Sequence, residues 1–327
     1  MPLVTNADRL ARRRDMDNAR YLYDFGGFLI DSGTPIAGLR SAANPNFAAR
    51  PIVIEVSAEP PPAPEKFVFS WPGRYGLRLG MVGKRWLMWS DFDGAFVIDT
   101  AVATITAHVT KVPLAPEAVD VLVRRILPRL TALLSESVPI HAAGVSDGER
   151  GYLLIGPSGA GKSTLAAACA HLAEWSIYSD DIAVLRCETI PLLTPSTTGV
   201  CVWPATRAGL AIDPARCTDM SGYDGKLHYQ PRAIGADRPV PLASAIFLER
   251  GDHADDPPQL VKMPVRTALI EAGDQFIRFN PGAPEPGEAA ILTLRFQRIL
   301  ERVPVFRLRY SAGYQNLPAV ISAIRDG

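Results

Sequence analysis

A glycine-rich stretch in the middle of the chain has the residue types and spacing of a phosphate-binding loop. It matches the G-x-x-x-x-G-K-[ST] pattern of Walker A loops at every fixed position, with the residues Gly156, Pro157, Ser158, Gly159, Ala160, Gly161, Lys162, Ser163 and Thr164. The glycines let successive backbone N–H groups converge on a polyphosphate, and a helix beginning near Thr164 would add its positive end. We expect Lys162 to reach the β- and γ-phosphates and the Ser163 hydroxyl to bind Mg2+. The stretch predicts nucleotide binding, and a glycine-rich turn without a ligand is the weaker alternative.

Two adjacent carboxylates, Asp180 and Asp181, follow the short apolar run 175–179. If this run returns as a strand after the loop's helix, a parallel β-α-β unit brings the carboxylates to the same sheet edge as the loop. One of the two acids could complete the Mg2+ shell with Ser163, and the other could take the proton from an attacking hydroxyl. A solvated acidic turn is the alternative interpretation.

His141 lies in the apolar segment 138–145, which precedes a turn at 146–150 and the strand 151–155 that enters the loop. A tight hairpin centred near Gly148 would place His141 opposite Ile155 or Gly156. In that position His141 could orient a base or contact the transferred group. An ordinary core or surface histidine is the alternative.

Further cations occur in the turn-rich segment 221–232, where Lys226 and Arg232 could clamp phosphate or substrate. Ordinary surface charges are the more common occurrence. Trp71, Trp86 and Trp89 could form a ligand cage, but aromatic residues on short strands more often fill a core.

The elements that must position these residues divide into two domains. Residues 1–115 alternate short apolar runs with turn residues, which predicts a smaller β-rich recognition domain. The expected strands are 21–31, 51–56, 67–71, 75–80, 85–89, 95–98 and 103–109, with a hairpin turn at 91–94. Residues 116–327 should form the α/β domain that carries the loop. Its other expected elements are a helix at 117–135 divided by Pro128, strands at 239–248 and 305–310, and helices at 163–172, 264–276, 287–303 and 317–324.

Composition narrows the function classes. Lysine and arginine total 34, and aspartate and glutamate also total 34. The sequence therefore lacks the excess of positive charge that is typical of nucleic-acid-binding proteins. The four cysteines, Cys169, Cys187, Cys201 and Cys217, form no C-x-x-C pair, which favours a reducing cytoplasm over a zinc site or a disulfide framework. The segment 8–15 is too polar for a signal peptide, and we expect no membrane association. The sequence leaves open whether the protein forms a homo-oligomer.

The order and spacing of His141, the Walker A loop and Asp180-Asp181 resemble those of the HPr kinase/phosphorylase family, whose catalytic domain is similar to that of phosphoenolpyruvate carboxykinases. The likeness covers about residues 140–186 well and the rest of the second half loosely. It implies Asp180 as base, Asp181 with Ser163 on Mg2+, Lys162 on the phosphates and His141 near the transferred group. The glycine- and isoleucine-rich downstream signature of the HPr enzymes is missing from the sequence. Tyr23–Phe28 and His141–Gly144 look more like the related serine kinases that tailor lasso-peptide precursors.

The resemblance implies an ATP- and Mg2+-dependent kinase whose acceptor is a serine hydroxyl on a peptide or small protein. A nucleotide-sensing regulatory module needs the loop but neither His141 nor the acidic pair. A small-metabolite kinase is the third possibility, and it would need a closed pocket in place of an open peptide groove. ATP is expected over GTP, but the sequence leaves GTP open.

Overall fold

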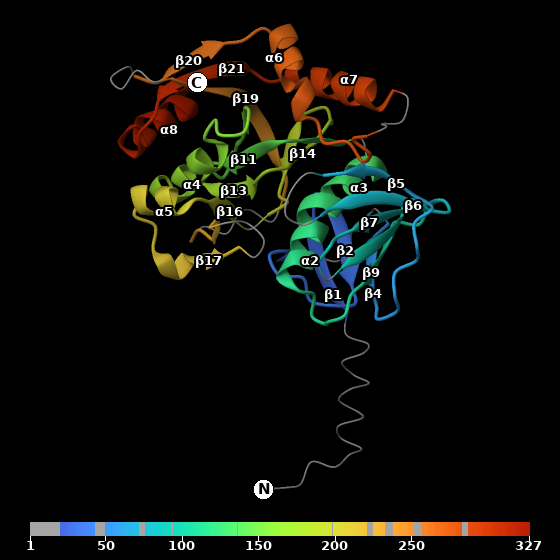
Figure 1. Cartoon of the computed structure of the whole chain (residues 1–327). Helices are drawn as coiled ribbons and strands as arrows, with labels where there is room; N and C mark the ends of the chain where they lie inside the picture. Colours follow the sequence, from blue (N-terminus) through green and yellow to red (C-terminus); the bar gives the residue numbers. More distant parts are fainter. Residues whose placement is uncertain are drawn as a thin grey trace, which may run out of the picture. The chain divides into compact units, whose positions relative to one another are not determined.

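The computed structural model describes residues 20–42, 50–71, 76–92, 94–135, 137–197, 199–220, 225–232, 238–251, 257–282 and 287–327. The chain divides into two units near residue 120 (Figure 1). Unit 1 covers the residues up to Val119, and unit 2 runs from Asp120 to Gly327 together with the short segments Phe25–Gly27 and Gly38–Arg40. Each unit contains a large mixed sheet, which confirms a mixed α/β protein with two sheet-rich regions. The polar segment 8–15 lies outside the described residues.

The sheet of unit 1 has nine strands in the order β3-β1-β2-β4-β9-β8-β7-β6-β5. Their bounds are β1 Tyr21–Phe25, β2 Phe28–Ser32, β3 Arg40–Ser41, β4 Ile52–Ser57, β5 Lys66–Ser70, β6 Arg78–Val82, β7 Arg85–Trp89, β8 Ala95–Asp99 and β9 Thr104–His108. Strands β5 to β9 form an antiparallel meander, whereas β2, β4 and β9 run parallel to one another. The expected β-rich first part is therefore present.

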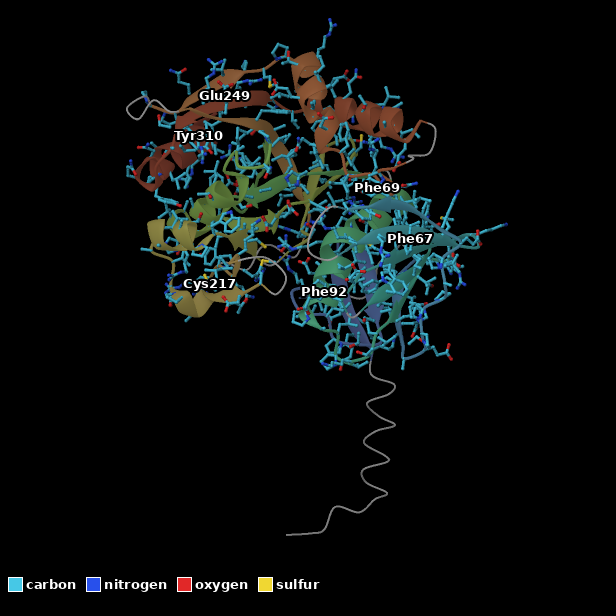
Figure 2. The ribbon with its side chains drawn as sticks, in the orientation of Figure 1. Phe67, Phe69, Phe92, Cys217, Glu249 and Tyr310 are labelled. Carbon is cyan, nitrogen blue, oxygen red and sulfur yellow. The ribbon has the colours of Figure 1, made fainter. Side chains whose placement is uncertain are left out.

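Two details of unit 1 differ from the expectations, and two residues of expected elements lie outside the described residues. The strand expected at 21–31 is two strands, because Gly26 and Gly27 have φ values of +61° and +80° and turn the chain. The core is filled by residues such as Leu87, Met88 and Phe96 of β7 and β8. Trp86 and Trp89 are only half-buried, and Arg78 lies between Trp89 and the exposed Phe67, which Figure 2 labels on β5. Tyr75 and Asp93, from the expected strand 75–80 and the turn 91–94, lie outside the described residues.

Unit 2 contains the helices and the second large sheet. Its strands are β10 Ser137–Ile140, β11 Ala142–Ser146, β12 Gly151–Ile155, β13 Ser176–Ser179, β14 Ala183–Arg186, β15 Leu192–Thr194, β16 Val200–Val202, β17 Cys217–Asp219, β18 Leu227–Tyr229, β19 Val240–Gly251, β20 Gln259–Lys262 and β21 Val305–Ser311. Its helices are α2 Pro116–Val121, which begins in unit 1, the π-helical η1 Leu122–Ile126, α3 Leu127–Leu134, α4 Lys162–Leu172, α5 Pro204–Gly209, α6 Val265–Ala272, α7 Glu288–Leu300 and α8 Leu317–Asp326. Short 3-10 turns are η2 Pro214–Arg216, η3 Gly273–Gln275 and η4 Tyr314–Asn316.

The large sheet of unit 2 has helices on both faces. Its main path is β10-β14-β15-β19-β12-β11-β13, with β21 paired to β19 and β20 paired to β21. Alternate residues of β12 enter different cores: Leu154 packs with α4 and α8, whereas Leu153 and Ile155 pack with α6 and α7. Figure 1 shows the two helix pairs on opposite sides of this sheet. Because successive residues of a strand point to opposite faces, this sheet is buried on both faces. Unit 2 therefore has three layers, with the sheet between two layers of helices.

Several elements of unit 2 were not expected from the sequence. The small sheet β16-β18-β17, the helix α5 and the strands β14, β15 and β20 all lie in segments rich in turn residues. Pro128 does mark a change in the helix expected at 117–135, since η1 separates α2 from α3 just before it. None of the helices in the part that the structure describes is long and apolar enough to span a membrane.

Candidate active site

The candidate phosphate loop connects β12 to α4 as the sequence predicts. Gly159 and Gly161 have φ values of +84° and +95°, which favour glycine, and a Cβ on Gly156 would lie only 2.9 Å from Cβ of Ala160. Helix α4 then begins at Lys162, two residues before the expected Thr164. The Thr164 hydroxyl contacts the hydroxyl of Thr206 on α5 at 3.2 Å. The loop therefore has the tight turn and helix start that anion binding requires.

Lys162 is buried and folds back over this loop. Its Nζ donates to the carbonyl oxygens of Gly156 at 2.6 Å and Pro157 at 3.2 Å. Burial lowers the pKa of Lys162, and the nearby carboxylates of Asp181 and Asp180 oppose this shift. The ammonium group thus lies at the mouth of the loop, where polyphosphate oxygens could replace the carbonyl partners.

The strands that lead to the loop and to the carboxylates are separated by one strand that the expected β-α-β unit lacks. β11 lies between β12 and β13 and is antiparallel to both, so β12 and β13 run in the same direction without being neighbours. Their carboxyl ends still meet one sheet edge. Ala142 pairs with Ile155, which places His141 next to Gly156 in the register, as predicted. Gly144 permits this packing, since a Cβ there would lie 2.7 Å from Oγ of Ser179.

Asp180 is the acid that contacts the loop. Ser163 Oγ donates to Asp180 Oδ1 at 3.1 Å. The other oxygen, Oδ2, accepts from the backbone N–H of Cys201 at 2.7 Å and from the Arg124 guanidinium at 3.2 Å. The side chain is only 2% exposed, so its charge is held by three donors in the protein interior.

Asp181 is directed to different partners. Its Oδ1 lies 3.2 Å from Nδ1 of His141 and its Oδ2 lies 3.9 Å from the Arg124 guanidinium, and its side chain is 32% exposed. Burial alone would raise the pKa of Asp181, but His141, Arg124 and Arg125 outweigh it and hold the pKa below its usual range. Its φ of +72° is an uncommon backbone conformation that aspartate tolerates. Such outliers cluster at functional sites.

The contacts of the two acids therefore differ from those that the resemblance implied. The resemblance implied Asp181 beside Ser163 and Asp180 as the base. In the structure Asp180 is the buried partner of Ser163, and Asp181 is the accessible acid beside His141. The reason is the turn at Asp181, because the positive φ directs consecutive side chains apart.

Arg124 joins both acids and was not expected from the sequence. Its guanidinium contacts Asp120 at 3.0 Å in addition to Asp180 and Asp181, and it also touches Sγ of Cys201. Burial alone would lower the pKa of Arg124, but Cys201 and the three carboxylates outweigh it and raise the pKa. On a regular α-helix, Arg124 would lie off the apolar face, whereas η1 changes the helical register. The pair Asp120 and Arg124, four residues apart, was the available signal.

The small sheet supplies two further neighbours of the acids. Cys201 on β16 is paired with His228 on β18. Burial lowers the pKa of His228, Arg124 lowers it further, and Asp180 opposes the change. Lys226 lies with its ammonium 5.2 Å from the ring centre of Trp203, and Arg232 is exposed near Tyr229. The roles of Lys226 and Arg232 as phosphate or substrate contacts stay predictions, and the residues 221–224 beside them lie outside the described residues.

The residues at the loop fit a magnesium ion. The hydroxyl of Ser163 and a carboxylate oxygen of Asp180 are hard oxygen ligands in contact with one another. Magnesium commonly uses one or two such ligands together with water and phosphate oxygens, not a complete protein cage. Within the described ranges, no cluster of three or more His, Cys, Asp or Glu side chains is placed to hold a metal. The pair at Ser163 is therefore the candidate site.

Comparison with known proteins finds no matching family model and no matching curated protein, so this interpretation depends on the residues themselves.

Proposed function

We propose that unit 2 is an ATP- and Mg2+-dependent kinase that transfers the γ-phosphate to a hydroxyl group. The observation that supports the proposal most is the hydrogen bond between Ser163 and Asp180, because it joins the Walker A loop to the acidic pair. A nucleotide sensor needs a phosphate loop alone. Transfer also needs a base near the terminal phosphate, and our candidate is the half-buried carboxylate of Asp181 beside His141.

In this proposal Asp181 accepts the proton of the acceptor hydroxyl. The acceptor oxygen forms a bond to the γ-phosphorus, the bond from that phosphorus to the β,γ-bridging oxygen breaks, and ADP leaves with the bond's electron pair. His141, at 3.2 Å, orients the carboxylate before the proton moves. Arg124 holds both acids in place from the interior side.

The loop provides the electrostatic part of the catalysis. Backbone N–H groups of 156–164 bind the phosphate oxygens, and Lys162 neutralises the β- and γ-phosphates after leaving its carbonyl partners. Ser163 and Asp180 would hold a magnesium ion, which when bound would supply positive charge next to the phosphates. Little covalent chemistry is asked of the protein, because positioning and charge neutralisation dominate phosphoryl transfer.

We propose a serine on a peptide or small protein as the acceptor, in line with the resemblance to HPr kinase/phosphorylase-related and peptide-tailoring kinases. Unit 1 would then contribute to recognition of the acceptor.

The test is incubation with Mg-ATP and a panel of serine-containing peptides, followed by mass spectrometry. We expect a mass gain of one phosphate on a serine, lost in Lys162→Ala and in Asp181→Asn. ATP binding without any phosphopeptide would favour the sensor, and phosphorylation of a small hydroxylated metabolite alone would favour the metabolite kinase.

A further inference from the structure

A cavity lies directly beside the candidate phosphate loop. It has a volume of about 250 Å3 and lies where α4 begins and where β21 turns into α8. Its lining residues are Gly161, Thr164, Arg250, Tyr310, Ala312, Gly313, Tyr314 and Leu317. None of the catalytic roles proposed above uses this cavity. Figure 2 labels Tyr310 on β21, which marks its position in unit 2.

The cavity and the phosphate loop share a wall. Gly161 and Thr164 belong to the loop and also line the cavity. Tyr310 joins the two, because its hydroxyl donates to the carbonyl oxygen of Ala160 at 2.8 Å, and a Cβ on Gly161 would lie 2.6 Å from that hydroxyl. A ligand whose phosphates occupy the loop would therefore have its next chemical group at the cavity.

The aromatic ring of Tyr314 is fixed before any ligand arrives. Gly209, the last residue of α5, has no side chain, and a Cβ there would lie 2.2 Å from Cδ2 and Cε2 of Tyr314. The ring therefore packs directly on the backbone of α5. Gly313, with φ of +126°, makes the turn that brings the ring to this position. The result is a half-buried aromatic wall with little freedom to lose on binding.

We propose that this cavity binds the nucleoside part of the nucleotide, with the base stacked on Tyr314. The proposal depends on the nucleotide binding inferred above and names the part of the ligand that the Walker loop does not hold. The volume lies just below the range of about 300–1,000 Å3 that is typical of small-molecule pockets, which suits one base and its sugar. Every base has a face that can stack on an aromatic ring. Leu317 adds apolar surface, and the exposed Arg250 adds a cation at the rim.

The experiment separates the base from the phosphates. Equilibrium affinities for ATP and for inorganic tripolyphosphate are measured with the full chain by calorimetry, for the wild type, Tyr314→Ala, Tyr314→Phe and Gly209→Ala. We expect Tyr314→Ala to weaken ATP binding about 10- to 100-fold, the usual range for loss of base stacking, and to leave tripolyphosphate affinity unchanged. Tyr314→Phe should stay near the wild type. Gly209→Ala should weaken ATP selectively by displacing the ring.

Retained tripolyphosphate binding also shows that each variant is folded, and Tyr21→Ala is a matched control for loss of a partly exposed tyrosine in unit 1. Equal affinity of the wild type for ATP and tripolyphosphate would overturn the proposal, as would unchanged ATP binding in both Tyr314→Ala and Gly209→Ala. Binding of neither compound by the wild type would overturn both the nucleotide site and the cavity's role. Selective ATP binding without transfer to any peptide would refute the peptide kinase and support the nucleoside site in the cavity.

Discussion

Asp180 and Asp181 are neighbours in the chain but are directed to different partners. We expect Asp181→Asn to lower kcat about 100-fold or more, because a general base contributes about 10²- to 10⁴-fold, with Mg-ATP affinity unchanged. Asp180→Asn should instead raise the Mg2+ concentration needed for half-maximal transfer. Initial rates at varied Mg2+ distinguish the two. Full transfer by Asp181→Asn would show that it is not the base.

Lys162 donates hydrogen bonds to the loop's own carbonyl oxygens, so its charge lies at the loop that we propose to bind phosphate. We expect Lys162→Ala to weaken ATP binding about 10- to 100-fold, since a hydrogen bond to a charged group is worth about 1.5–3 kcal/mol. Calorimetric titration measures the change. Lys226→Ala is the comparison, and we expect it to weaken ATP binding less than Lys162→Ala because the ammonium of Lys226 lies over Trp203. An equal loss in Lys226→Ala would place that lysine on the phosphates.

Arg124 is the cation that makes the buried charge of Asp180 tolerable. Removing one partner of a buried ion pair costs about 3–5 kcal/mol, so Arg124→Gln should lower the free energy of unfolding by about that amount. Urea denaturation measures this. Arg125→Gln, at the next position of η1, is the control and should have a smaller effect, because of these two arginines it is Arg124 that donates to Asp180 in the contacts described. Equal stability of Arg124→Gln and the wild type would contradict this role.

The hairpin between β11 and β12 sets the position of His141 relative to the phosphate loop. Asp147 closes it by accepting hydrogen bonds from the backbone N–H groups of Glu149 and Arg150 and from the hydroxyl of Tyr152, at 2.8 to 3.1 Å. The ring of Tyr152 stacks on Trp175 at 4.9 Å and so ties the hairpin to the core. Burial alone would raise the pKa of Asp147, but these hydrogen bonds outweigh it and lower the pKa.

We expect Asp147→Asn to lower the free energy of unfolding by about 1–3 kcal/mol at pH 7. Because the folded pKa is depressed, the stabilisation is complete well above the unfolded pKa of about 3.9 and is lost as the pH falls through the folded value. The difference between wild type and variant should therefore shrink in acid. Urea denaturation at several pH values tests this, with the exposed Glu149→Gln as control. A difference in the free energy of unfolding between wild type and Asp147→Asn that grows as the pH falls would contradict the predicted direction.

The two units of the molecule should respond separately to ligands. Every residue of the proposed nucleotide site lies in unit 2. A ligand that binds the folded state stabilises it by about 2.7 kcal/mol at 100 times its dissociation constant. We therefore expect Mg-ATP to slow amide hydrogen exchange in β12, α4 and β13, and to leave β5 to β8 unchanged. A bound acceptor peptide should slow exchange in unit 1. Slower amide exchange in β5 to β8 when Mg-ATP is bound without an acceptor peptide would contradict this division.

Local patterns were sufficient for much of unit 2. The Walker A motif is a short-range feature, since the glycines and Lys162 act through the backbone within a few residues. The strand 151–155 and the hairpin register at His141 also follow from local alternation and a turn, and both are present. The β-rich first part was visible for the same reason.

The sequence by itself therefore determined the glycine-rich turn before α4 and the nearness of His141 to it, because both depend on neighbouring residues and on a tight turn. Only the tertiary structure decided that β11 separates β12 from β13, that Asp180 and not Asp181 contacts Ser163, and that Arg124 joins the two acids. These features depend on strand order, on one positive φ and on contacts such as that of Arg124 with Cys201. Packing between segments far apart in the chain creates them, and no local periodicity carries that information.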